Sequence, residues 1–191
     1  MSEVKVDTIS ERTAANGVVV DGVTIKDSGI TIPSGGTIQV DGTLKAANGI
    51  LFGTDTAAAN TLDDYEEGTW TPVLSFGGGS TGITYNTQQG FYTKVGRITI
   101  ATTNISLSSK GTSTGTASIN LPFTSGSIGE QHFQPYLVNT TSTGNVSFFA
   151  RTNLATATFV QFSDAGNATF ITNSNFANNS FIRATLVYQT A

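Results

Sequence analysis

Residues 181–189 near the C-terminus have the sequence Phe-Ile-Arg-Ala-Thr-Leu-Val-Tyr-Gln. Successive side chains of a β-strand point to opposite faces, so a strand here separates these residues into two sets. One set is Ile182, Ala184, Leu186 and Tyr188, and the other is Phe181, Arg183, Thr185 and Val187. The first set is apolar throughout, and the pattern predicts a long strand.

The residues from Trp70 onward consist of similar segments between turn residues. Turn signals recur about every 10 to 15 residues, which is typical of a β-sandwich or jelly roll. About 120 residues with most of the chain's 12 Phe residues can bury a core of their own. We therefore predict an antiparallel β-sandwich or jelly roll with strands at 69–76, 90–95, 97–107, 114–121, 133–139, 145–151, 159–163, 168–171 and 181–189.

The composition supports an all-β fold. Only 12% of the residues are charged, and Val, Ile, Thr and Phe are used where long helices would use Ala, Leu, Glu and Lys. Phe148 and Phe149 are adjacent and must face opposite sides of a strand. At least one of them therefore needs a second sheet, another subunit or a ligand to cover it.

Residues 17–53 are repetitive and punctuated by Gly. Val-Asp-Gly at 20–22 recurs at 40–42, Ala-Ala-Asn-Gly at 14–17 recurs at 46–49, and apolar pairs at spacing i, i+2 lie between the turns. Each predicted short strand has few apolar side chains, so neighbouring chains must complete its core. We expect a trimeric shaft that resembles a triple β-helix or β-prism, with a disordered Gly-rich linker as the alternative.

These observations divide the chain into four parts. We expect an anchoring arm at 1–16, the shaft at 17–53, an acidic neck at 54–68 and a β-sandwich knob at 69–191. In the arm, Val4, Val6 and Ile9 alternate with charged residues, as in a short strand that docks on another surface.

Four acids within residues 63–67 form the acidic neck. Such a cluster is typical of a solvated connector, and Ca²⁺ binding is the alternative because calcium prefers carboxylate oxygens. The spacing does not fit an EF-hand loop. We expect no metal and no cofactor.

Catalytic motifs are weak throughout the chain. Gly77–Gly82 fits GxGxxG, and residues 78–82 and 111–115 fit GxSxG, but strands and turns rather than helices are expected around them. His132 is the only histidine; it is expected at a surface or strand edge, or on a threefold axis where three copies hold a metal. Glu130 and Asp164 are the only acids after Glu67, so a glycosidase pair has few candidates. We expect no catalytic residue.

Ligand contacts are expected instead in the aromatic and Asn-rich loops of the knob. Exposed aromatic rings beside amide side chains are a common way to bind sugars, and loops carry recognition. The candidates are Tyr85, Tyr136, Asn173, Asn175 and Asn178, each of which is also compatible with a purely structural role.

Charge and hydropathy exclude two classes of partner. Eleven of the thirteen acids precede residue 72, and no basic cluster with interleaved aromatics follows, so nucleic-acid binding is not expected. No stretch approaches the roughly 20 apolar residues that cross a bilayer, so membrane insertion is not expected.

Residues 60–72, Asn-Thr-Leu-Asp-Asp-Tyr-Glu-Glu-Gly-Thr-Trp-Thr-Pro, resemble a segment of virion fibre proteins from tailed bacteriophages, especially marine ones. Residues 90–97, Gly-Phe-Tyr-Thr-Lys-Val-Gly-Arg, and the opening residues 4–9 resemble the same group. The resemblance covers most of residues 1–105 and the last strand and carries no catalytic residue. It implies a homotrimer with an N-terminal anchor and a C-terminal knob.

The expected function is therefore that of a phage virion protein. The arm would bind a phage tail or capsid protein, and the knob would bind a host surface glycan or protein. A capsid head fibre or decoration protein without a specific receptor role is the alternative, and a glycan depolymerase is a third possibility.

Overall fold

The computed structural model describes residues 37–52, 54, 56–57, 60–62, 64–127 and 131–191. The chain forms two compact units, Met1–Lys45 and Ala46–Ala191. The expected anchoring residues Val4, Val6 and Ile9, and most of the expected shaft, lie outside the described residues.

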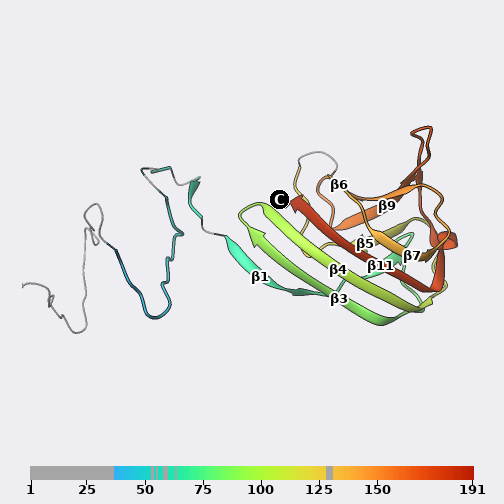
Figure 1. Cartoon of the computed structure of the whole chain (residues 1–191), viewed down its shortest axis with the longest axis horizontal. Helices are drawn as coiled ribbons and strands as arrows, with labels where there is room; N and C mark the ends of the chain where they lie inside the picture. The colour runs from blue at the N-terminus through green and yellow to red at the C-terminus, as the bar shows by residue number, and fades with distance from the viewer. Residues whose placement is uncertain (1–36, 53, 55, 58–59, 63, 128–130) are drawn as a thin grey trace, which may run out of the picture. The chain divides into compact units, whose positions relative to one another are not determined.

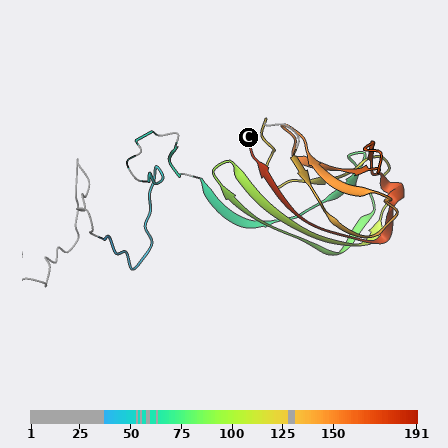
Figure 2. The ribbon, with the colours of Figure 1, turned by 45° about the horizontal axis from the view of Figure 1, so that its top comes forward.

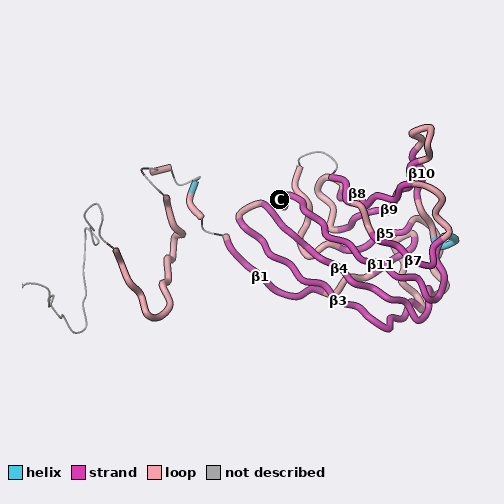
Figure 3. Tube along the Cα trace, in the orientation of Figure 1, coloured by secondary structure: helices cyan, strands magenta, loops and turns pink. Residues whose placement is uncertain are grey.

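The second unit is all-β, as predicted, and its strands pair antiparallel (Figures 1 and 3). A 3₁₀ turn, η2 (Asn173–Asn175), precedes the last strand. The strands are β1 (Tyr65–Trp70), β2 (Leu74–Phe76), β3 (Ile83–Val95), β4 (Ile98–Lys110), β5 (Ala117–Asn120), β6 (Gln131–Phe133), β7 (Tyr136–Thr140), β8 (Asn145–Ala150), β9 (Thr156–Phe162), β10 (Ala168–Phe170) and β11 (Phe176–Gln189). No helix of the described residues has the length and apolarity that a membrane crossing requires.

The strands form two sheets that enclose one core (Figure 2). The five-stranded sheet has the order β1-β3-β4-β11-β7. The six-stranded sheet has the order β2-β5-β9-β8-β6, with β10 added beside β9. Ile105 and Leu186 of the first sheet and Phe148 and Phe159 of the second sheet are fully buried in the same core.

The alternation predicted for residues 181–189 is confirmed. Ile182, Ala184, Leu186 and Tyr188 are all at most 6% exposed, whereas the residues between them face away from the core. The strand begins at Phe176, five residues before the predicted start, because Phe176 packs against Phe76 and Phe159 and so closes the core at this end.

Two prolines divide segments that were predicted as single strands. The predicted strand 69–76 is interrupted at Pro72, and 133–139 is interrupted at Pro135. Proline has no N–H to donate to a neighbouring strand. Each interruption is a crossing between sheets, from β1 to β2 and from β6 to β7.

The described residues before β1 contain no strand of three or more residues. Ile50 and Leu62 form an isolated bridge through two backbone hydrogen bonds of 3.0 and 2.9 Å. Six large apolar side chains of residues 37–52 are at least 41% exposed: Ile38, Val40, Leu44, Ile50, Leu51 and Phe52. Among the described residues of one chain, nothing buries these six side chains.

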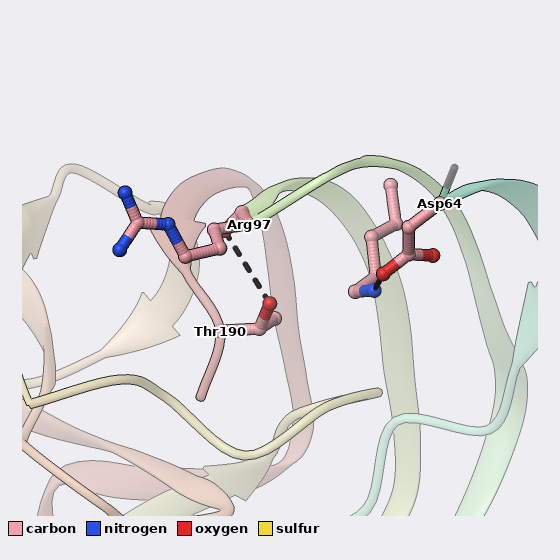
Figure 4. Close-up of polar contacts among 4 residues, drawn as sticks. Asp64, Arg97 and Thr190 are labelled. Atoms are coloured by element: carbon pink, nitrogen blue, oxygen red, sulfur yellow. Dashed lines mark hydrogen bonds and ion pairs between the residues drawn. The ribbon is translucent and has the colours of Figure 1, made fainter. Parts of the chain in front are cut away.

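Backbone and side-chain contacts fix the start of the sandwich (Figure 4). Asp64 forms an ion pair with Lys94, and its carbonyl accepts a hydrogen bond from the Gly96 N–H. The Arg97 carbonyl accepts hydrogen bonds from the N–H and hydroxyl of Thr190 at 2.8 and 3.4 Å. The last four residues of the expected neck, 65–68, are therefore part of strand β1.

Candidate functional site

The sandwich has two ends that differ in their loops. Tyr65, Val95 and Ile98 lie at one end, which we call the base, because strand pairing aligns them. The opposite end, the tip, carries the loops 77–82, 111–116, 141–144, 163–167 and 171–175. These loops are rich in Gly, Ser, Thr and Asn, as expected of a recognition surface.

The Asn side chains predicted to bind a ligand have partners within the chain. Asn173 Oδ1 accepts a hydrogen bond from the Gly115 N–H at 3.0 Å, and Asn175 Oδ1 accepts one from the Thr172 N–H at 3.0 Å. Asn178 Oδ1 accepts one from the Lys110 N–H at 3.0 Å. The Asn173 and Asn178 bonds hold the 171–178 segment against residues 110–115, and the Asn175 bond closes the turn within that segment, so the three amides stabilise the loops.

Tyr85 is also held internally. Its ring packs against the core, and its hydroxyl accepts a hydrogen bond from the Leu74 N–H at 3.1 Å. Burial raises the pKa of Tyr85 above the usual value of a phenol. This contact links the five-stranded sheet to β2 of the other sheet.

Tyr136 is the predicted aromatic ligand residue that stays open to solvent. Its side chain is 64% exposed, and its ring meets the ring of Phe181 edge-to-face with centroids 6.2 Å apart. The contact with Phe181 restrains the orientation of Tyr136 while leaving most of it accessible. Tyr136 therefore has the exposure that stacking on a sugar or peptide requires.

A cleft of about 330 Å³ lies beside Tyr136 at an open edge of the sandwich. Its polar lining includes Gln134, Thr140, Ser142 and Asn145. β7 is the last strand of its sheet, and β6 pairs with β8 only from Phe148 to Ala150, so the backbone of residues 145–147 is unpaired on this side. The cleft thus combines an aromatic ring with amides, hydroxyls and free backbone groups.

The polar residues of this cleft were not predicted from the sequence. Gln134, Ser142 and Asn145 lie in or beside the turns that flank β7. The signal that could have found them is Pro135, which ends β6 and turns the chain toward the other sheet, together with the polar turn at 140–144.

A second cleft lies on the other side of the 141–144 loop. It has a volume of about 310 Å³ and includes Gln161, Asp164 and Asn167. Gln161 Oε1 accepts a hydrogen bond from the Thr143 N–H at 3.4 Å, which joins the 141–144 loop to strand β9. Glu130, the other acid considered for catalysis, lies outside the described residues.

His132 lies on the edge strand β6 and is exposed. Its ring packs edge-to-face on Phe149 with centroids 3.9 Å apart, and Phe162 lies on Phe149 as well at 5.8 Å. Phe148 points into the core on the other side of the same strand. The adjacent Phe pair is therefore covered on both faces within one chain, and His132 serves as part of the cover.

No protein family matches this chain, and neither a curated protein nor a solved structure is significantly similar to it. The resemblance to virion fibre proteins thus rests on the motifs at residues 4–9, 60–72 and 90–97.

Proposed function

We propose that this chain is a structural protein of a tailed-bacteriophage virion, a homotrimeric, tail-fibre-like appendage whose sandwich contacts the host surface. The observation that carries the proposal is the exposure of every large apolar side chain between Ile38 and Phe52. Exposed apolar side chains gathered in one segment need partners, and no strand among the described residues covers them. Equivalent segments of two further copies would cover them.

The cleft beside Tyr136 at the open edge of the sandwich supports a role in attachment. An exposed ring with amides and hydroxyls around it suits a surface glycan or an extended peptide. The N-terminal arm, with Val4, Val6 and Ile9, is proposed to bind a tail or capsid protein. In this arrangement one end of the chain joins the particle and the other reaches the host.

A second function is favoured by one observation at the tip. Asn173, Asn175 and Asn178 are engaged by backbone N–H groups, which leaves fewer free amides for a receptor than the sequence indicates. A capsid head fibre or decoration protein without a specific receptor role fits this arrangement. The two functions differ in whether the tip binds host cells.

Two experiments test the proposal. Antibodies against the full chain should label intact phage particles in electron micrographs, at the tail for a tail fibre and at the head for a capsid fibre. Purified full-length protein, mixed with host cells before infection, should reduce phage adsorption. Absence of label from particles would contradict the virion assignment, and unchanged adsorption would leave only the decoration function.

The role of the cleft is tested with a matched pair of variants. Tyr136→Ala should abolish the competition for adsorption, whereas Leu154→Ala, which truncates a 44% exposed side chain near the base, should compete as well as the original chain. Equal competition by both variants would place the receptor contact elsewhere.

A further inference from the structure

The outer face of the five-stranded sheet has an apolar half. Strand alternation points one set of side chains to the core and the other set to solvent. Near the base the outward set includes six large apolar or aromatic side chains that are 43–60% exposed, and we call them the base patch: Tyr65, Phe91, Val95, Ile98, Ile100 and Val187.

Strand pairing makes the base patch continuous. Ile100 lies opposite Val187 on one neighbouring strand and opposite Thr93 on the other, and Ile98 lies opposite Val95. Toward the tip the same face becomes polar, with Gln89 and Asn104 in outward positions. Large continuous apolar patches on a folded domain mark sites of interaction.

The outer face carries very few charges. On β1, β3, β4 and β11 the charged residues that point outward are Glu67 and Arg183. Among the described residues neither forms an ion pair: Glu67 accepts a hydrogen bond from the Tyr65 hydroxyl at 2.9 Å, and Arg183 lies 5.3 Å from the ring centre of Phe181. Interface cores are depleted in charged residues in the same way.

The two charges lie on opposite sides of the face. Glu67 is on the edge strand β1, and Arg183 is on β11, with β3 and β4 between them. Copies arranged in a ring bring the β1 side of one copy toward the β11–β7 side of the next. Glu67 of each copy then approaches Arg183 of its neighbour, and like charges stay apart.

We propose that the base patch is covered by other copies of this same chain, arranged around a common axis with Glu67 of each copy facing Arg183 of the next. The outer face has a hollow of about 280 Å³ lined by Phe91, Asn104 and Arg183, which provides room for a side chain of the neighbour. The inference takes one element from the proposed function, namely that residues 37–52 join the copies to one another. The surface that it names belongs to the sandwich itself.

The position of the base patch fits this arrangement. The Asp64 carbonyl binds the Gly96 N–H in the turn between Val95 and Ile98, so the patch begins where the chain enters the sandwich. Copies joined through the preceding segment are closest together at this end. Four of the six side chains of the base patch are branched aliphatics, which offer no ring for stacking on a sugar, and the patch has no cation cluster for an anionic partner.

Thiol labelling of the full chain tests the inference, since the sequence contains no cysteine. Ile100→Cys places a single thiol in the base patch, and Leu154→Cys places one at a site of equal exposure outside it, 44% against 45%. In the assembled protein we expect a maleimide to modify the Ile100→Cys variant about tenfold more slowly than the Leu154→Cys variant. In denaturant both variants should react at the same rate.

The outcomes distinguish a failure of this inference from a failure of the proposed function. Equal labelling of the two variants in a trimer would overturn the inference and leave the proposed function intact, whereas a monomeric original chain would overturn both. Protection of Ile100→Cys that appears only after addition of an oligosaccharide would make a glycan the occupant and overturn the inference. If Ile100→Cys does not fold, Val187→Cys tests the same patch, and fast labelling there contradicts the inference equally.

Discussion

Ile100 and Val187 lie directly opposite each other on β4 and β11, and both are about half exposed to solvent. Two β-branched aliphatic side chains in this relationship stabilise a sheet by packing across the strands. Their remaining exposed surface is available to a partner. The pair is at the centre of the proposed contact between copies.

Ile100→Glu should weaken the assembled protein. It removes apolar surface from the proposed contact and brings like charges of neighbouring copies together, so we expect a loss of at least about 1.5 kcal/mol per chain in the free energy of unfolding. Denaturant unfolding over a range of protein concentrations measures this loss. Leu154→Glu, at a comparably exposed site, should change the stability by less than about 0.5 kcal/mol. Equal effects of the two substitutions would argue against a contact at Ile100.

Gly90→Ala should displace Trp70. A β-carbon at Gly90 would lie 2.6 Å from Cε2 and 2.7 Å from Cδ1 of the indole, far inside van der Waals contact. The indole N–H donates a 3.2 Å hydrogen bond to the Thr102 carbonyl, and displacement breaks it. We expect a destabilisation of about 1–3 kcal/mol.

Trp70 is the single tryptophan, so a red shift of its fluorescence in folded Gly90→Ala would report the displacement directly. Thr169→Ala, at an exposed position on β10 of the other sheet, is the control. An unshifted emission with full stability would show that Trp70 does not depend on Gly90.

Tyr188 should make the sandwich sensitive to high pH. Its hydroxyl donates to the Phe123 carbonyl at 3.1 Å and accepts from the Phe123 N–H at 3.2 Å. Burial raises the pKa of Tyr188 to about 12, above the ordinary tyrosine value of 10.0. The folded chain therefore holds this proton more tightly than the unfolded chain does.

The sign of the effect follows from this difference in proton binding. The stabilisation is complete below about pH 10 and is lost between about pH 10 and pH 12, by on the order of 2 kcal/mol. Denaturant unfolding on both sides of this range measures the loss. Tyr188→Phe should reduce the pH dependence, and an unchanged dependence would assign it to other groups.

Asn173→Ala should loosen the tip loops without unfolding the sandwich. It removes the acceptor of the Gly115 N–H, whose loss should cost about 1 kcal/mol. Hydrogen exchange at Gly115 and its neighbours should accelerate, while exchange in β4 and β11 stays slow. Asn167→Ala, which truncates an exposed side chain in another tip loop, serves as the control. Unchanged exchange at Gly115 would show that Asn173 is not a brace.

The strands of the sandwich were largely predictable from the sequence. Alternation in residues 181–189 and turn residues at regular spacing report local properties of the chain, and the structure confirms the all-β, antiparallel fold. The assignment of strands to sheets was less predictable. Pro72 and Pro135 end strands in a way the sequence shows, but the crossing to the opposite sheet depends on the whole core.

The candidate site was predicted only in part. Asn173 looks like a ligand residue because its actual partner, Gly115, is 58 positions away in the sequence. Tyr85 likewise binds the Leu74 N–H of the other sheet. Tyr136 remains a prediction for ligand binding, and its cleft depends on two strand edges that meet only in the folded chain.

Sedimentation equilibrium of the purified full-length chain tests the central claim most directly. The account predicts one species with three times the 19.9 kDa mass of a single chain, stable on dilution. A folded species with the mass of one chain, at all concentrations, would contradict it.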